Sequence, residues 1–384
     1  MQEIIYEMNP WWEAEYKFIG IKREKYLNIL IQNLNNKDII FLTGLRRIGK
    51  STILKQLIYL LINEQKINPK EICYLSLDNY SFKEYTITEL VRQFRKINNL
   101  KINDKIYLFL DEITYKDSFK EELKNLYDLE HTKIFATSSS ANKLVDKKAL
   151  LTGRARTIEV NPLDFQEFLI FKNYKPKNSE KYLLENYFKK YMELGGIPEY
   201  VITEDPTYVT NLTENILYKD IIAANNIKNS ENVKDLFRLL CERVGKPLSN
   251  NKLANIIGIN KNTVKKYIGF FKETYLFYVI EKDAKTLNQR IADNKKIYCA
   301  DVGIKNVSTG FKDLGAIYEN LVFLKIKTEQ PRFIYENSIE IDFKFKDTII
   351  EAKYNQEMNN KQKELFSKIK VKNKIIANGV DFFS

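Results

Sequence analysis

The chain has 384 residues, and its 62 lysines and arginines against 50 acidic residues give a net charge of +12. The length favours two or three domains, and the positive charge favours a polyanionic partner such as nucleic acid or nucleotide phosphates. A single histidine, His131, excludes a histidine metal cluster, and three cysteines far apart in sequence (Cys73, Cys241 and Cys299) exclude a CxxC zinc or redox pair.

The N-terminal stretch and the apolar runs give no sign of an export or membrane segment. Residues 1–18 carry acidic side chains and have no long apolar centre. The longest apolar runs, such as Leu60-Leu61-Ile62, are far shorter than the ~20 residues that span a bilayer. Unpaired cysteines fit a reducing compartment. We therefore expect a cytoplasmic protein with no membrane partner.

Four short apolar runs separated by helical patterns predict an α/β domain that ends near residue 160. The runs are 38–43, 72–77, 106–110 and 133–137. Apolar residues at helical spacing follow the first run, and a further helical pattern covers 119–127. Continuous apolar strands that alternate with helices are typical of a parallel sheet covered on both faces.

The rest of the chain has three successive regions with different predicted secondary structure. Residues 161–225 are helical and aromatic, with breaks at Pro176, Gly195-Gly196 and Pro198. A helical pattern at 231–245 is followed by two short helices, 250–257 and 260–274, which have helix-turn-helix spacing around Gly258. The β-like runs 276–281 and 296–299 flank a basic connector, and this arrangement predicts a winged helix. From residue 313 the pattern is helix, strand, strand, strand, helix, strand.

A phosphate-binding loop follows the first apolar run. Residues 44–51, GLRRIGKS, fit G-x-x-x-x-G-K-[ST] between a strand and a helix. The two glycines permit backbone angles that turn amides toward a phosphate, and the helix start adds its positive dipole end. The alternative is a chance match in an ordinary strand–helix turn. The residues expected to bind nucleotide are Gly44, Leu45, Arg46, Arg47, Ile48, Gly49, Lys50, Ser51 and Thr52.

An acidic pair ends the third apolar run, at the edge of the sheet that also carries the loop. Asp111 is expected to hold Mg²⁺ together with the Ser51 hydroxyl, and Glu112 to polarise the attacking water. Lys50 would contact the β- and γ-phosphates. The expected cofactors are therefore ATP and Mg²⁺. The alternative for the acidic pair is a solvated turn.

Seven short motifs occur in an order that resembles a known family. They are GLRRIGKST, FLDEI, ATSSS, LTGRA, PLDFQEFL, GGIPEYV and YENLVF. In these the chain resembles the prokaryotic AAA+-like "archaeal ATPase" family, whose members join an ATPase core to a winged helix and a nuclease-like domain. The resemblance implies an α/β P-loop NTPase (AAA+-like) core with its N-terminal segment at 1–160, a helical lid at 161–225, a winged helix at 226–300 and a restriction-endonuclease-like α/β domain at 301–384.

The resemblance also implies roles for residues near the γ-phosphate. Thr137 or Ser139, in ATSSS, would be the sensor, unless this is a Ser/Thr-rich loop that caps a helix. Arg154 would be the arginine finger or sensor, with Arg156 in reserve and a surface arginine as the alternative. An arginine supplied by another copy requires a homo-oligomer, and the choice between the same chain and a second copy stays open.

The resemblance also implies that two further segments lie near the adenine base. Residues 18–30 resemble the segment that lies against adenine in switch-type NTPases. Pro198 resembles the lid proline that touches the nucleotide, although a proline there also fits a plain helix breaker.

The helix-turn-helix carries polar side chains suited to DNA. Its second helix has five such residues, Lys261, Asn262, Thr263, Lys265 and Lys266. These residue types contact phosphates and base edges in a major groove, and Arg290, Lys295 and Lys296 would add charge on the wing. A protein-interaction or spacer role is the alternative.

The C-terminal region contains a D…E-x-K pattern. Asp342 precedes Glu351 by nine positions, and alternation along the two strands lets Asp342, Glu351 and Lys353 share one side of a sheet. This is the arrangement of the restriction-endonuclease-like fold, in which two carboxylates hold Mg²⁺. Glu319, on the preceding helix, would be a further ligand. The alternatives are surface ion pairs or a relative that has lost catalysis.

The sequence thus predicts an ATP-binding, Mg²⁺-dependent ATP-hydrolysing switch protein that acts on DNA through the winged helix and the C-terminal domain. Two alternatives remain open: an ATP-regulated, Mg²⁺-dependent nuclease, and a nucleotide-dependent scaffold that does not hydrolyse ATP.

Overall fold

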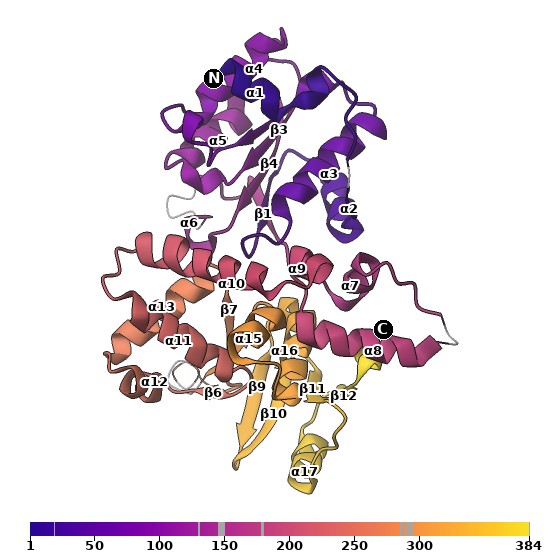
Figure 1. Cartoon of the computed structure of the whole chain (residues 1–384), viewed down its shortest axis with the longest axis vertical. Helices are drawn as coiled ribbons and strands as arrows, with labels where there is room; N and C mark the ends of the chain where they lie inside the picture. The colour runs from indigo at the N-terminus through magenta and orange to yellow at the C-terminus, as the bar shows by residue number, and fades with distance from the viewer. Residues whose placement is uncertain are drawn as a thin grey trace. The chain divides into compact units, whose positions relative to one another are not determined.

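The computed structural model describes residues 1–18, 20–129, 131–144, 150–177, 180–284, 286, 288, 290 and 295–383. It divides into two units, Met1–Val160 and Asn161–Ser384 (Figure 1). Ile19 of the segment expected against adenine, and residues 291–294 of the expected wing, lie outside the described residues. Within the described residues, no helix combines the length and the hydropathy that a membrane crossing requires.

The first unit is built on a five-stranded sheet in the order β2-β3-β4-β1-β5, with every neighbouring pair parallel. The strands β1, β3 and β4 are buried along their whole length, as their continuous apolar sequences require. The expected parallel sheet is confirmed, and its fifth strand was not assigned from sequence. The strands are β1 (Ile39–Thr43), β2 (Ile72–Ser76), β3 (Ile106–Asp111), β4 (Thr132–Ser138) and β5 (Ala155–Glu159).

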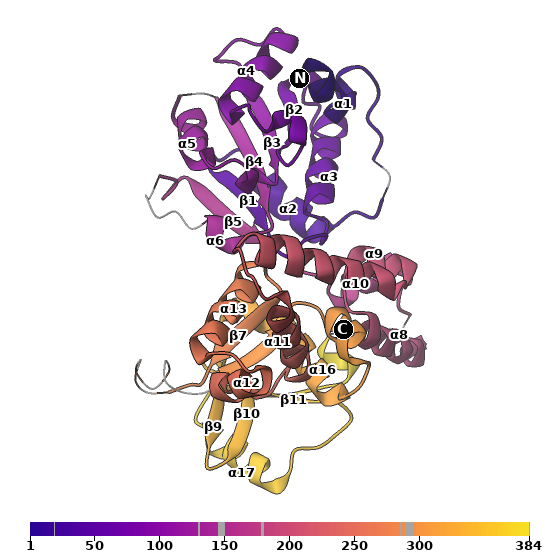
Figure 2. The ribbon, with the colours of Figure 1, turned by 60° about the vertical axis from the view of Figure 1, so that its left-hand side comes forward.

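Helices cover both faces of this sheet. Helices α2 and α3 lie on one face, and α4 and α5 lie on the other (Figures 1 and 2). The indole N–H groups of Trp11 and Trp12 donate to the Ile72 carbonyl at 3.2 and 2.9 Å, and this ties the N-terminal segment to β2. The helices are α1 (Gln2–Met8), α2 (Glu24–Gln32), α3 (Lys50–Asn63), α4 (Ile87–Ile97), α5 (Phe119–Leu129) and α6 (Ala141–Leu144), with short 3₁₀ turns at Pro10–Trp12, Pro69–Glu71, Tyr80–Phe82 and Ile113–Tyr115.

The second unit begins with helices. A π-helical segment, Ile216–Ala223, directly follows α10, and α11 packs against this segment. The helices before the first strand of this unit are α7 (Phe165–Phe171), α8 (Lys181–Leu194), α9 (Pro198–Thr203), α10 (Pro206–Asn215) and α11 (Ser230–Glu242).

The two short helices and two strands expected after residue 247 are present, together with a third strand that was not assigned from sequence. Strands β6 (Pro247–Leu248), β8 (Lys295–Cys299) and β7 (Phe277–Glu281) form a small antiparallel sheet in that order. Helices α12 (Asn250–Ile257) and α13 (Lys261–Glu273) precede β7, and α12 ends at Gly258 in a left-handed conformation (φ 77°).

The C-terminal part confirms the expected order of helix, three strands, helix and strand. The sheet order is β12-β11-β10-β9, parallel between β11 and β12 and antiparallel elsewhere. Apolar residues of β9, β10 and β11 form a core with Met358 and Phe366. The elements are α15 (Val302–Thr309), α16 (Leu314–Ile326), β9 (Arg332–Glu336), β10 (Ile339–Phe345), β11 (Thr348–Lys353), α17 (Asn360–Lys368) and β12 (Asn373–Asn378), with 3₁₀ turns at Lys327–Glu329 and Val380–Phe382.

Candidate functional site

The phosphate loop connects β1 to α3 at the carboxyl edge of the parallel sheet. Gly44 (φ 131°) and Gly49 (φ 94°) both adopt positive φ, and a Cβ on Gly44 would lie 2.3 Å from the Val160 carbonyl oxygen. Lys50 is the first residue of α3, and its side chain is buried. Its Nζ donates to the carbonyls of Gly44 and Leu45 at 3.0 and 2.9 Å. The loop is therefore wrapped around the Lys50 ammonium at a helix N-terminus, which suits a phosphate.

A buried arginine supports the loop from the N-terminal segment. The Arg23 guanidinium donates to the Ile48 carbonyl at 3.1 Å. The Arg23 backbone N–H donates to the Gln56 side chain on α3 at 3.2 Å, and the Gln56 amide donates to the Ile21 carbonyl at 2.7 Å. Residues 21–23 thus lie beside the loop. Sequence reasoning placed this segment near the nucleotide but did not single out Arg23.

Asp111 lies at the same edge of the sheet and accepts two hydroxyl groups. The register that pairs Leu110 with Ala136 brings Asp111 beside Thr137 at the ends of β3 and β4. Thr137 donates to Asp111 at 2.5 Å, and Tyr74 of β2 donates to the other carboxylate oxygen at 2.7 Å. Burial and the Asp111 charge raise the pKa of Tyr74, so this hydroxyl stays a donor. Sequence reasoning missed Tyr74. The one sequence feature that points to it is its hydroxyl group within an otherwise apolar strand.

Glu112 follows in a left-handed conformation (φ 51°) that turns its side chain away from the line of the strand. Its backbone N–H donates to the Thr137 hydroxyl at 2.8 Å. Ser139 donates to its carboxylate, with oxygen–oxygen distances of 3.0 and 3.2 Å. The structure therefore brings together the acidic pair and both sensor candidates, at the sheet edge from which the phosphate loop also emerges.

Arg154 lies at the amino edge of the sheet, opposite the carboxyl edge from which the phosphate loop emerges. Its carbonyl accepts the Ile39 N–H at 2.8 Å at the start of β1, whereas the phosphate loop follows Thr43, about 13 Å further along the strand. Its guanidinium pairs with Asp128 at 3.2 Å. The reserve candidate, Arg156, pairs with Asp38. The fold thus separates both arginines from the phosphate loop of their own chain.

Pro198 begins α9 in the second unit, and packing explains the glycines before it. The Asp301 carboxylate accepts the backbone N–H of Gly196 at 2.6 Å and that of Gly303 at 2.8 Å. A Cβ on Gly195 would lie 2.2 Å from an Asp301 oxygen. Burial raises the pKa of Asp301 to about 6, although these amides act against the shift. The contact of Pro198 with nucleotide remains a prediction.

Helix α13 presents a polar face to solvent. Lys261, Asn262, Lys265 and Lys266 are exposed, and Thr263 is half-buried. The two lysines expected on the wing do not share this exposed, polar setting. Lys295 pairs with Glu281 across the β7–β8 ladder at 3.1 Å. Lys296 is completely buried, so its placement on an exposed wing was wrong.

Lys296 lies instead among the C-terminal carboxylates. Its Nζ is 2.7 Å from Glu319, 2.6 Å from Glu340 and 3.4 Å from Asp342. The Tyr298 hydroxyl, two residues along β8, also donates to Glu319 at 2.7 Å. Sequence reasoning missed Lys296 and Glu340 here, although alternation places Lys296 and Tyr298 on one side of their strand.

The four residues expected to form a nuclease-like site do lie near one another. Lys353 pairs with Glu351 at 2.8 Å, and Glu351 accepts the Asp342 backbone N–H at 3.2 Å. Asp342 accepts the Ala352 N–H at 2.9 Å. Burial and the Asp342 charge raise the pKa of Glu319 to about 8 and that of Glu351 to about 7.

This donor set does not fit a metal ion. Lys296 pairs with Glu319 and Asp342, and Lys353 pairs with Glu351. Among the described residues, no group of three or more histidine, cysteine or acidic side chains is placed to hold a metal. The expected Mg²⁺ ligation by Glu319, Asp342 and Glu351 therefore has no geometric support.

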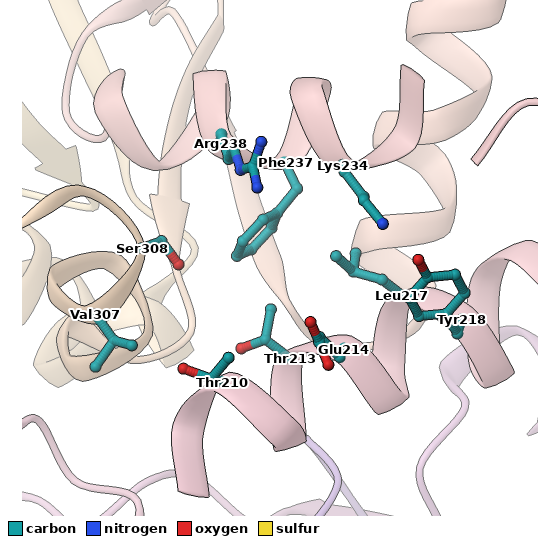
Figure 3. A pocket seen from close by; sticks show the side chains of 10 residues that line it. All are labelled: Thr210, Thr213, Glu214, Leu217, Tyr218, Lys234, Phe237, Arg238, Val307 and Ser308. Atoms are coloured by element: carbon teal, nitrogen blue, oxygen red, sulfur yellow. The ribbon is translucent and has the colours of Figure 1, made fainter. Parts of the chain in front are cut away.

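A separate pocket of about 240 Å³ lies in the second unit (Figure 3). Thr213 and Glu214 of α10 line one side, and Lys234 and Arg238 of α11 line the other. The Thr213 hydroxyl is buried without a hydrogen-bond partner in the described part of the chain. None of the pocket's lining residues was singled out from the sequence.

Comparison with protein families agrees with the site at the parallel sheet. Residues 36–169 match the model of an AAA domain, and residues 185–314 match a domain of unknown function (DUF8612). Residues 36–169 are thus similar to AAA domains, and residues 185–314 are similar to a domain with no assigned role.

The relatives are uncharacterized bacterial and archaeal proteins. An uncharacterized protein of Haemophilus influenzae is 29% identical over 322 residues, which cover 80% of this chain and 78% of that protein. The uncharacterized protein MJ1544 of Methanocaldococcus jannaschii is 29% identical over 374 residues, covering 90% and 81%.

Similarity to solved structures is weaker. AMPPCP-bound DnaA from Aquifex aeolicus matches 69% of this chain and 92% of its own chain, at 19% identity and a TM-score of 0.31. C. elegans PCH-2 matches 55% and 61%, at 18% identity and a TM-score of 0.34. These scores carry no conclusion about function.

Proposed function

We propose that the protein is a Mg²⁺-dependent ATPase whose reaction takes place at the carboxyl edge of the parallel sheet. The observation that carries the proposal is the network of Asp111, Glu112, Thr137 and Ser139 at the edge from which the phosphate loop emerges. The residues suit ATP and Mg²⁺, since the loop amides and Lys50 supply positive charge and Ser51 and Asp111 supply oxygen ligands.

Each side chain has a defined task in this proposal. Lys50 exchanges its hydrogen bonds with the loop carbonyls for contacts to phosphate oxygens. Tyr74 and Thr137 fix the orientation of the Asp111 carboxylate, which together with Ser51 would hold Mg²⁺. Glu112 polarises the attacking water, and Ser139 fixes its carboxylate. Bound Mg²⁺ supplies charge neutralisation on the phosphates.

Release of inorganic phosphate from ATP by the full chain tests the proposal. We expect turnover that requires Mg²⁺ and disappears with excess EDTA. Folded protein that binds ATP without turnover would instead support the nucleotide-dependent scaffold. A Mg²⁺-dependent nuclease is not favoured, because Lys296 lies among the carboxylates that would hold the metal.

Arg154 is proposed to act on the nucleotide of a second copy. The proposal follows from its position at the far edge of its own sheet, and it requires a homo-oligomer. The Asp128 pair would be exchanged for phosphate oxygens.

Mixing two inactive variants tests this role. Lys50→Ala disables the phosphate loop but keeps Arg154, and Arg154→Ala keeps the phosphate loop intact. We expect each variant alone to lose turnover by at least tenfold, and an equal mixture to regain part of it. Arg156→Ala is the matched control and should stay near wild type. A mixture no more active than its components would contradict action in trans.

The exposed lysines of α13 support a proposed DNA contact by a winged helix formed by residues 226–300. Four exposed polar side chains on one helix suit phosphate and base-edge contacts. Lys295 is paired with Glu281 and Lys296 is buried, so neither lysine is part of the proposed contact.

A further inference from the structure

The Lys296 side chain is the central cation of the C-terminal carboxylate cluster. It reaches from β8 to Glu319 on α16 and to Glu340 and Asp342 on β10, with all three contacts between 2.6 and 3.4 Å. Its side chain has no exposed surface. Three elements that are distant in sequence therefore converge on one ammonium group.

Acidic groups surround this ammonium. Burial lowers the pKa of Lys296, but the charges of Glu319, Asp342 and Glu340 and the Tyr298 hydroxyl raise it well above its usual value overall. A buried ammonium without such partners would lose its proton, and buried carboxylates without a cation would gain one. The contacts between Lys296 and the carboxylates therefore offset the cost of burying these groups.

The same contacts compete with a metal. A divalent cation held by Asp342 and Glu319 would compete with the Lys296 ammonium for Glu319 Oε1 and Asp342 Oδ1. Glu319 also lies close to the backbone of Gly245, where an added Cβ (φ 74°) would be 2.9 Å from a Glu319 oxygen. The neighbouring Glu351 is paired with Lys353 and with Gln362, at 2.8 and 3.0 Å.

We propose that the Lys296 ammonium is a built-in substitute for a divalent cation: it joins β8, α16 and β10 and leaves these carboxylates unable to bind metal or to support cleavage of nucleic acid. The C-terminal domain is then a structural or binding module that resembles a nuclease in its residue pattern alone. This inference is independent of ATP hydrolysis at the first unit.

Counting bound Mn²⁺ by electron paramagnetic resonance tests the proposal on the full chain without nucleotide. Wild type and Asp342→Asn should bind equal numbers of Mn²⁺. Lys296→Met should gain one site per chain, and Lys296→Met/Asp342→Asn should lose that site again. Lys296→Arg is the matched control, because it keeps a cation and should gain no site.

Thermal unfolding gives a second readout. Lys296→Met should melt at a lower temperature than wild type, and Mn²⁺ should restore several degrees of that loss while leaving wild type unchanged. The proposal would be overturned if wild type bound one Mn²⁺ more than Asp342→Asn. It would also be overturned if a folded Lys296→Met gained no Mn²⁺ site. If Lys296→Met does not fold, the comparison of wild type with Asp342→Asn decides alone.

Discussion

Replacing Lys50 by alanine is expected to weaken ATP binding by about 100-fold and to abolish turnover. The substitution removes charge-assisted hydrogen bonds worth about 1.5–3 kcal/mol each, and 1.4 kcal/mol is about tenfold in affinity. It also removes the donor that the Gly44 and Leu45 carbonyls now accept from. Equilibrium binding of a fluorescent ATP analogue and phosphate release measure the two effects.

Two control variants separate charge at the loop from charge in general. Lys101→Ala removes an exposed lysine near the start of β3, away from the loop, and should bind ATP as wild type does. Lys50→Arg keeps the charge but places a larger group at a buried position, so it should recover only part of the affinity. Wild-type affinity in a folded Lys50→Ala would refute the assignment of the loop.

Glu112→Gln is expected to slow turnover by a factor of about 10² to 10⁴ while ATP binding stays within about threefold of wild type. Glutamine fills the same space and still accepts the Ser139 hydroxyl, but it cannot act as a base. Single-turnover hydrolysis, measured beside equilibrium ATP binding, distinguishes the two effects.

The matched control for Glu112 is Asp117→Asn, which removes an exposed carboxylate a few residues further along the chain. We expect it to hydrolyse ATP at the wild-type rate. Equal rates for wild type and Glu112→Gln would mean that Glu112 takes no part in the chemical step. If neither protein turned over ATP, the scaffold would be favoured.

Local sequence patterns were sufficient for most of the first unit. A buried apolar strand, a glycine loop and a helix are adjacent in sequence, so the phosphate loop could be predicted without tertiary contacts. Asp111 and Thr137 could be predicted at one edge because parallel strands end together. Tyr74 could not, because its role depends on a hydroxyl that reaches Asp111 from a neighbouring strand.

Tertiary placement decided the cases that sequence left open or missed. The motif around Arg154 carries no information about which edge of the sheet it occupies, and only the pairing of β1 with β5 fixes it. Lys296 lies in a basic run that is typical of a solvated wing. Its burial depends on Glu319 and Glu340, which are far along the chain and on other elements.

The most direct test of the central claim is a calorimetric titration of Mg·ATP into the folded, full-length chain. We predict a saturable heat with one binding site per chain, and its loss in Lys50→Ala. No heat from wild type, under conditions where its thermal unfolding shows an intact fold, would contradict ATP binding at the phosphate loop.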